Sequence, residues 1–207
     1  MIMAVLGKVK EAGLPLMKLV KLRGMPILQQ LHLEERLLRT SSDNWCLIND
    51  GTSSPAIVMG LSGIMSWSGL LYSEVFEGLA GFHLRENDYV FDDRKFGGNA
   101  QSITKHRWIH HTSFLWDYEV KNMSYLKLPA KAPEYRLTRS HMDFVCRMKE
   151  YVPRSEFIEK TIKAIGGQFS VKSISLESID IPSVSEYVHT TRLLTEQEIQ
   201  EACTIQT

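Results

Sequence analysis

Apolar residues recur with the period of an α-helix in several segments of the chain. Ile27, Leu31 and Leu38 follow one another near a period of 3.6 residues, whereas Glu34 and Glu35 lie on the other side of the same helix. Similar patterns predict helices from residue 26 to 39 and at residues 65–79, 118–128, 141–152, 154–166 and 195–203.

Two of these helices also carry capping signals. Ser155 can cap the helix at residues 154–166, and the pair Gly166-Gly167 can end it. Thr195 and Glu198 have the spacing of a capping box at the start of the last helix.

Shorter runs rich in β-branched and aromatic residues predict strands between the helices. In residues 94–117 two such runs flank a central dipeptide, which predicts a hairpin. A two-residue turn there would place Asn99 opposite Thr112 and Ala100 opposite His111. Because strands and helices mix without a βαβ rhythm, the pattern favours an α+β fold. Further strands are predicted at residues 44–50, 55–60 and 82–93, the last divided by a polar break at 86–88.

Composition and charge narrow the class of protein. The 207 residues are 43% apolar and 23% charged, and 24 basic residues balance 24 acidic ones. Such a balance creates no overall field that would attract nucleic acid or an anionic membrane. No apolar run approaches the ~20 residues of a membrane span. The cysteines Cys46, Cys146 and Cys203 lie far apart without a CxxC pair, which favours a reducing compartment.

The first 23 residues are strongly basic and have two interpretations. They can be an N-terminal extension that targets the chain to mitochondria, which would be dispensable for folding, or a basic first strand or helix of the fold. The mitochondrial interpretation has a cytoplasmic location as its alternative. The basic residues are Lys8, Lys10, Lys18, Lys21 and Arg23, against the single acid Glu11.

The stretch "RKFGGNAQ", residues 94–101, carries the strongest chemical signal. It is not a P-loop or a dinucleotide fingerprint, because the lysine precedes the glycines and a strand follows them. Gly97 and Gly98 make the backbone thin enough to approach a ligand closely, and Lys95 can place its charge on a carboxylate or phosphate oxygen. The alternative is a surface lysine beside a β-bulge.

Polar residues on either side strengthen the ligand interpretation. Asn87 and Asp88 could hold Mg²⁺ or a phosphate shell through oxygen atoms. His106, His110 and His111 follow downstream, but they lack a further ligand at the spacing of a metal site.

Four segments together resemble the lipoate–protein ligase A family of the biotin/lipoate ligase superfamily. They are "PILQQLHLEERLLR", "PAIVMG", "LRENDYVFDDRKFGGNAQS" and "RWIHHTSFLWDYEV", and the resemblance covers roughly residues 24–150. It implies a catalytic domain with a mixed or antiparallel sheet flanked by helices. It also implies that Lys95 is the catalytic residue that contacts the acyl carboxylate and the acyl-adenylate, and that Asp88 is a candidate Mg²⁺ ligand. The implied substrate- and nucleotide-binding residues are Asn87, Asp88, Gly97, Gly98, Asn99, Ala100, His111 and Thr112.

The resemblance further implies a reaction and its participants. Members of the family activate lipoate or octanoate with ATP and Mg²⁺ to an acyl-AMP. They then transfer the acyl group to a lysine of a lipoyl acceptor domain, such as an E2 subunit or the glycine-cleavage H protein. Neither nucleic acid nor a membrane is implied as a partner.

Two departures from the family pattern change these expectations. Octanoyl transferases of the superfamily use a cysteine where this chain has "LKLPAKAP", and Cys146 falls on an apolar helix face, so we expect it in the core. The family segment RRxxGGGxV is missing between "VMG" and "MSWSG". We therefore expect a domain at residues 24–207 with an internal deletion near residues 63–64. The alternative function is a catalytically inactive splice form that acts at most as a binding module.

Overall fold

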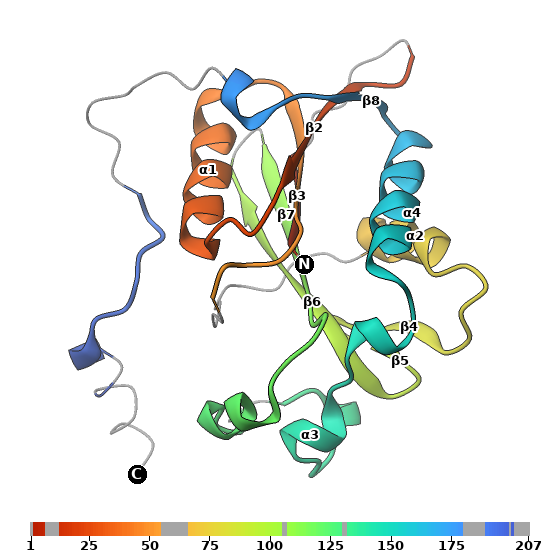
Figure 1. Cartoon of the computed structure of the whole chain (residues 1–207), viewed down its shortest axis with the longest axis vertical. Coiled ribbons are helices and arrows are strands. Elements are labelled where there is room, and N and C mark those ends of the chain that lie inside the picture. The colour runs from red at the N-terminus through yellow and green to blue at the C-terminus, as the bar shows by residue number, and fades with distance from the viewer. Residues whose placement is uncertain are drawn as a thin grey trace.

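One mixed sheet forms the centre of the molecule. The computed structural model describes residues 2–6, 13–54, 66–104, 107–129, 132–179, 189–198 and 200. Within these residues the sheet has eight strands in the order β4-β5-β6-β7-β1-β3-β2-β8 (Figure 1). The strands are β1 (Ile2–Leu6), β2 (Leu16–Leu22), β3 (Asn44–Asn49), β4 (Phe82–Arg85), β5 (Asp88–Phe91), β6 (Arg94–Ile103), β7 (Trp108–Phe114) and β8 (Ser170–Ser173).

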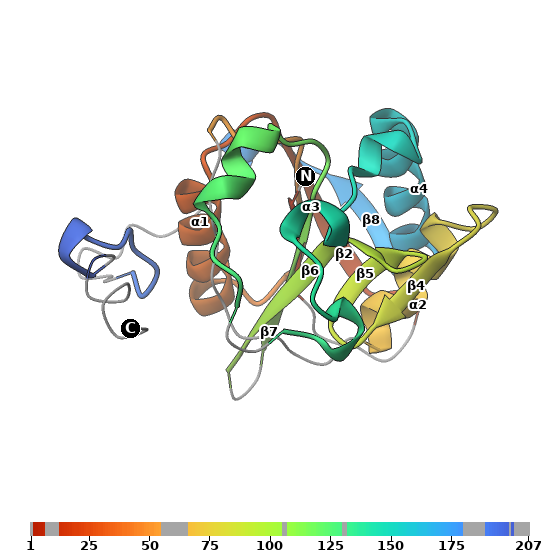
Figure 2. The ribbon, with the colours of Figure 1, turned by 90° about the horizontal axis from the view of Figure 1, so that it is seen from below.

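Helices cover both faces of the sheet, so the predicted α+β class with a mixed sheet is confirmed. Helix α1 (Ile27–Thr40) lies on one face, while α2 (Ser66–Val75) and α4 (Arg154–Gly166) pack together on the other (Figures 1 and 2). Short helices complete the described structure: α3 (His141–Phe144) and 3₁₀ turns at Val120–Tyr125, Glu134–Arg136, Met148–Glu150 and Leu176–Ser178.

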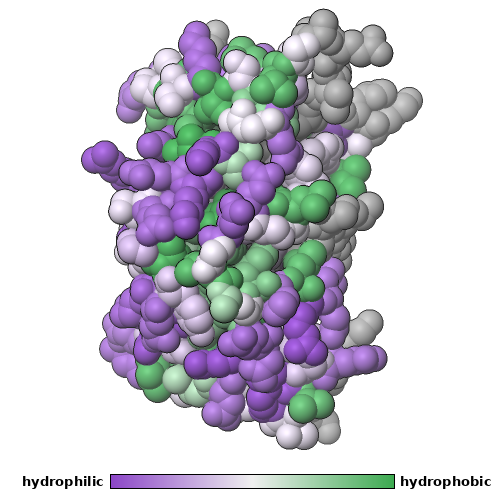
Figure 3. Space-filling view, turned by 90° about the vertical axis from the view of Figure 1, so that its right-hand side faces the viewer, coloured by the Kyte–Doolittle hydropathy of each residue, from purple (hydrophilic) through white to green (hydrophobic). Residues whose placement is uncertain are grey.

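The two faces of the sheet have different cores. Under α2 and α4 lies a mainly aromatic cluster in which Tyr72, Phe76 and Phe157 pack against strand residues such as Phe96 and Phe114. The outer surface of this layer mixes hydrophilic and hydrophobic side chains (Figure 3). Under α1 lies a smaller, mainly aliphatic cluster that includes Leu33, Leu37, Val20, Leu22 and Trp45.

The second half of the basic N-terminal segment is a strand of the fold. β2 runs parallel to both β3 and β8, and its residues Met17, Leu19, Val20 and Leu22 are at most 3% exposed. β1 pairs antiparallel with β3 and β7. The strand was one of the two interpretations, and its burial argues against the expectation that residues 1–24 are dispensable for folding, which stays to be tested.

The hairpin of β6 and β7 has the predicted register. Asn99 pairs with Thr112 and Ala100 with His111. The backbone at residues 105–106, the predicted strand at 55–60 and the junction at 63–64 lie outside the described residues.

The predicted helix at residues 141–152 is wrong in its central part. The helix ends at Phe144, because the next residues run extended beside β6. Val145 forms a parallel bridge with Lys95, and the amide of Cys146 donates to the carbonyl of Lys95 at 2.9 Å. Long-range pairing with β6 therefore replaces the local helical preference.

Two capping signals have different outcomes. Helix α4 begins after Pro153, so Ser155 lies inside the first turn and is not its N-cap, contrary to our prediction. The predicted capping box is confirmed, because the amide of Glu198 donates to Thr195 Oγ1 and the amide of Thr195 donates to Glu198 Oε2.

Candidate functional site

β5 and β6 bring Lys95 and Asp88 together on one face of the sheet. Asp88 pairs with Gly98 and Val90 with Lys95, and the register shifts between these pairs. The shift places Lys95 Nζ 2.6 Å from Asp88 Oδ1, with 36% and 10% of the two side chains exposed. A Cβ atom at Gly98 would lie 3.5 Å from Lys95 Nζ, an ordinary contact distance, so the ammonium lies directly beside this glycine.

The other carboxylate oxygen of Asp88 also has a partner. The hydroxyl of Tyr135 donates to Asp88 Oδ2 at 2.8 Å. Burial, and then the negative charge of Asp88, raise the pKa of Tyr135, so this hydroxyl stays protonated and remains a donor. Tyr135 has no periodic signal in the sequence, because it lies in the proline-punctuated loop "PAKAPEYR".

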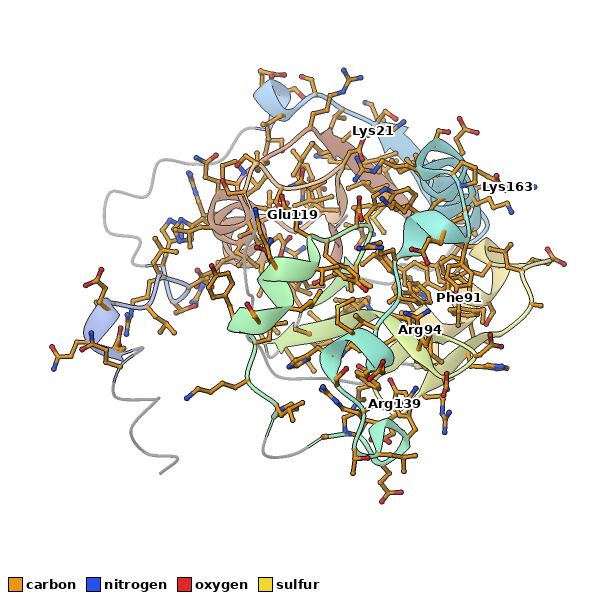
Figure 4. The ribbon with its side chains drawn as sticks, turned by 60° about the horizontal axis from the view of Figure 1, so that its bottom comes forward. Lys21, Phe91, Arg94, Glu119, Arg139 and Lys163 are labelled. Atoms are coloured by element: carbon orange, nitrogen blue, oxygen red, sulfur yellow. The ribbon has the colours of Figure 1, made fainter. Side chains whose placement is uncertain are left out.

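Figure 4 labels two arginines of this region, Arg94 of β6 and Arg139 in the loop before α3. Arg94 Nη2 donates to the carbonyl of Val145 at 2.7 Å, and Arg139 Nη1 donates to Asp93 Oδ2 at 2.9 Å. These contacts tie the segments before and after α3 to the start of β6, the strand that carries Lys95.

A Mg²⁺ ion does not fit Asp88 in this arrangement. One oxygen holds the ammonium of Lys95 and the other accepts from Tyr135, so a cation would have to displace Lys95. Across the described ranges there is no group of three His, Cys, Asp or Glu side chains that could hold a metal. Asn87, the other predicted oxygen donor, lies in the exposed turn between β4 and β5.

His111 is part of a buried polar chain under α1. Its Nδ1 lies 3.0 Å from Glu34 Oε2, Glu34 Oε1 accepts from Gln30 Nε2 at 2.6 Å, and Gln30 Oε1 accepts from Asn49 Nδ2 at 3.0 Å. Burial lowers the pKa of His111, but the charge and hydrogen bond of Glu34 raise it further, to a net value above its ordinary one. All four residues are at most 5% exposed.

The sequence pattern did not reveal these buried polar contacts. The helical pattern put Glu34 on the polar side of its helix together with Glu35, yet both are buried, at 2% and 8% exposure. Glu35 accepts from Thr190, so the segment after residue 188 covers this side of α1. A partner so distant in the sequence leaves no trace in a local pattern.

The residues named by the resemblance divide between the two faces of the sheet. Asp88, Lys95, Gly98, Ala100 and His111 share the face that looks toward α1 and α3, as the contacts above and strand alternation require. The rest of the hairpin residues lie on the aromatic face.

On the aromatic face, these residues meet the core. A Cβ atom at Gly97 would lie 2.9 Å from the ring of Phe114, and Thr112 is fully buried beside the hydroxyls of Tyr72 and Tyr89. Asn99 pairs with Thr112 across the ladder. These three positions fix the hairpin to the core, and the Lys95 face is the candidate site.

The cysteine near the site has the character of a core residue. Cys146 is fully buried, its thiol donates to the carbonyl of Arg94 at 3.5 Å, and burial raises its pKa. A thiolate nucleophile needs the opposite shift.

None of the described helices is long and apolar enough to cross a membrane.

Comparison with known proteins shows a similarity over the middle of the chain. Residues 70–170 match the lipoyl protein ligase A/B catalytic domain. In an alignment of 110 residues that covers 45% of this chain and 29% of the other protein, the chain is 36% identical to the inactive lipoate–protein ligase 2 of Plasmodium falciparum isolate 3D7. Over this region the chain is similar to proteins of the lipoate/biotin protein ligase superfamily.

Solved ligases of this superfamily have the same fold. A lipoate–protein ligase A bound with ATP aligns over 80% of this chain and 91% of its own, at 12% identity and a TM-score of 0.54. A bipartite lipoate ligase with its E2 lipoyl domain from Thermoplasma acidophilum covers 91% of both chains, at 13% identity and a TM-score of 0.54. P. falciparum LipL1 in complex with lipoate covers 78% and 66%, at 13% identity and a TM-score of 0.52.

Proposed function

We propose that the Lys95 face binds the acyl phosphate of an acyl-adenylate made from lipoate or octanoate and ATP, as a step in protein lipoylation. The observation that carries the proposal is the partly exposed ammonium of Lys95, held by Asp88 beside Gly98. A fixed cation of this kind is most effective when it faces negative charge that develops in a transition state. Solved ligases of the same fold with ATP or lipoate bound support this substrate class.

The proposed chemistry has two steps. The carboxylate of the acyl substrate attacks the α-phosphorus of ATP, which forms the acyl-adenylate and releases pyrophosphate. A lysine of an acceptor domain then attacks the acyl carbon, and AMP leaves. Lys95 would stabilise the phosphate oxygens in both steps. The ligase of T. acidophilum, solved with its E2 lipoyl domain, supports an E2 domain or an H protein as acceptor.

A second candidate is a binding module with little or no turnover. The chain lacks the RRxxGGGxV segment, and "LSGIMSWSG" has isolated glycines and no arginine pair in its place. The site would then lack the backbone amides that such a glycine-rich segment would place opposite Lys95. The relative that is 36% identical is itself called inactive. We therefore expect at most trace ligase activity.

The test measures acyl-AMP formation and acyl transfer separately. Purified chain is incubated with ATP, Mg²⁺ and lipoate or octanoate, with and without an apo H protein or E2 domain. We expect slow acyl-AMP formation that Lys95→Ala reduces by ~10²–10³, the usual cost of one lost donor at developing charge. Lys121→Ala, at a side chain that is 78% exposed, is the matched control.

The outcomes separate the two candidates. Tight binding of an acyl-adenylate analogue without turnover supports the binding module. Equal acyl-AMP formation by the wild type and Lys95→Ala removes Lys95 from the mechanism, and absence of both binding and turnover rejects the proposal. Turnover equal to that of a ligase that retains the glycine-rich segment contradicts the expectation of trace activity.

A further inference from the structure

The loop at residues 132–139 is fixed to the hairpin of β4 and β5 at several points. The amide of Glu134 donates to Glu86 Oε1 at 2.8 Å, and the guanidinium of Arg85 lies 4.5 Å from the ring centroid of Tyr135. The Tyr135 hydroxyl reaches Asp88, and Tyr135 as a whole is only 8% exposed. The loop thus brings one buried hydroxyl to the carboxylate that holds Lys95.

The same loop contains a strained backbone. Leu137 has φ 55° and ψ −136°, a region that a leucine rarely adopts, and it is 78% exposed. Its exposed side chain gives no packing reason for the conformation. Arg139 holds the loop in place, because its Nη2 donates to the carbonyl of Tyr135 at 2.7 Å and its Nη1 to Asp93. Strain held by specific contacts beside a site is typical of a functional loop.

We propose that Tyr135 is a positioning residue, whose hydroxyl fixes Asp88 so that Asp88 holds Lys95 in the orientation that contacts the acyl phosphate. The proposal rests on the proposed function and adds a residue that the sequence did not indicate. Lys95 depends on Asp88 Oδ1, and Asp88 depends on Tyr135 through Oδ2.

The role of the Tyr135 hydroxyl can be tested separately from that of the ring. The ring of Tyr135 packs on Phe144, with centroids 5.3 Å apart, and on Arg85, and a phenylalanine would keep both contacts. Only the hydroxyl touches Asp88. Without it a largely buried carboxylate oxygen loses its donor, and the carboxylate is free to rotate away from Lys95.

The first test measures Lys95 in the ligand-free protein. Competitive labelling with acetic anhydride, followed by mass spectrometry, compares Lys95 with the exposed Lys121 in the same sample. We expect Asp88→Asn to speed Lys95 labelling about threefold, within the range for a partly exposed ion pair. Tyr135→Phe should give a smaller increase, and the double variant should equal Asp88→Asn alone, because Tyr135 acts through Asp88. Tyr125→Phe, at a tyrosine that is 78% exposed, is the control.

A second arm tests the link to the ligand. Titration calorimetry with a non-hydrolysable lipoyl-adenylate analogue should show binding to Tyr135→Phe that is about tenfold weaker, the size of one lost hydrogen bond to a charged group. Unchanged Lys95 labelling in Tyr135→Phe, or additive effects in the double variant, would overturn the positioning role. A wild type that fails to bind the analogue rejects the proposed function instead, and the labelling result still decides whether Tyr135 positions Lys95.

Discussion

The two faces of the β6–β7 hairpin contrast strongly, although their residues alternate along the same two strands. Phe96 is fully buried among aromatic rings, whereas its neighbour Lys95 is partly exposed and paired with Asp88. On β7, His110 faces the aromatic side, edge-on to Trp67, and its neighbour His111 faces Glu34 of α1. One face is apolar packing with isolated polar groups, and the other is a set of connected polar groups.

The contrast shows what a motif in a strand can mean. Successive side chains of a strand point to opposite faces, so a continuous signature of eight residues contributes only half of them to one site. The remainder serves the core that holds the site in place. A function assigned to the signature as a whole therefore mixes two physical roles, and substitutions can separate them.

The largest effect should come from the removal of residues 1–24, because β2 contributes to both faces. Met17 and Leu19 belong to the aromatic cluster and Val20 and Leu22 to the cluster under α1. Each buried aliphatic side chain contributes about 1.5–3 kcal/mol, against a total stability of about 5–15 kcal/mol. We expect the shortened chain to lose its cooperative unfolding transition by circular dichroism.

A control variant and one contradicting outcome sharpen this test. Lys21→Ala, at an exposed position of β2 (labelled in Figure 4), removes a basic charge but keeps the strand, and it should unfold like the wild type. A shortened chain with the same midpoint as the full chain would show that β2 is not part of the cooperative core. A fluorescent reporter fused to residues 1–30 tests separately whether the segment directs the chain to mitochondria, which remains a proposal.

Adjacent substitutions in β6 should differ sharply in stability. Phe96→Ala removes a fully buried ring and should cost about 3–5 kcal/mol in the free energy of unfolding. Lys95→Ala removes a partly exposed ion pair and should cost about 1 kcal/mol or less. Urea denaturation of both variants measures the difference, and similar losses would contradict the separation of the two faces.

Local patterns were sufficient for much of this fold. Periodicity predicted α1, α2 and α4, and the pairing of Asn99 with Thr112 followed from the hairpin alone. These elements form between residues that are close in sequence, so their signal is local.

Contacts between distant segments could not be predicted in the same way. Residues 145–147 are extended because β6 offers a partner about fifty positions earlier, although their own pattern is helical. Tyr135 meets Asp88 across a similar separation in sequence, and Glu34 of α1 meets His111 of β7, 77 positions later. The resemblance supplied Lys95 and Asp88, but the residues that hold them are visible only in three dimensions.

The last comparison concerns pH, where the two adjacent histidines should act in opposite directions. Burial, and then the charge of His111, lower the pKa of His110 from 6.5 to about 4. The unfolded chain therefore binds the proton more readily than the folded one, and stability falls as the pH drops from 6.5 toward 4, by about 3 kcal/mol in total. The pKa of His111 is raised, so its contribution is complete below pH 6.5 and is lost as the pH rises through the folded value.

Urea denaturation of wild type, His110→Gln and His111→Gln between pH 4 and 8 resolves these contributions. His110→Gln should lose less stability than the wild type on acidification, since glutamine does not titrate. His111→Gln should lose less on passing from pH 6 to 8, although its absolute stability is lower because Glu34 loses a buried partner. If both variants changed the pH dependence in the same direction, the two histidines would share one environment, and the contrast between the faces of β7 would be wrong.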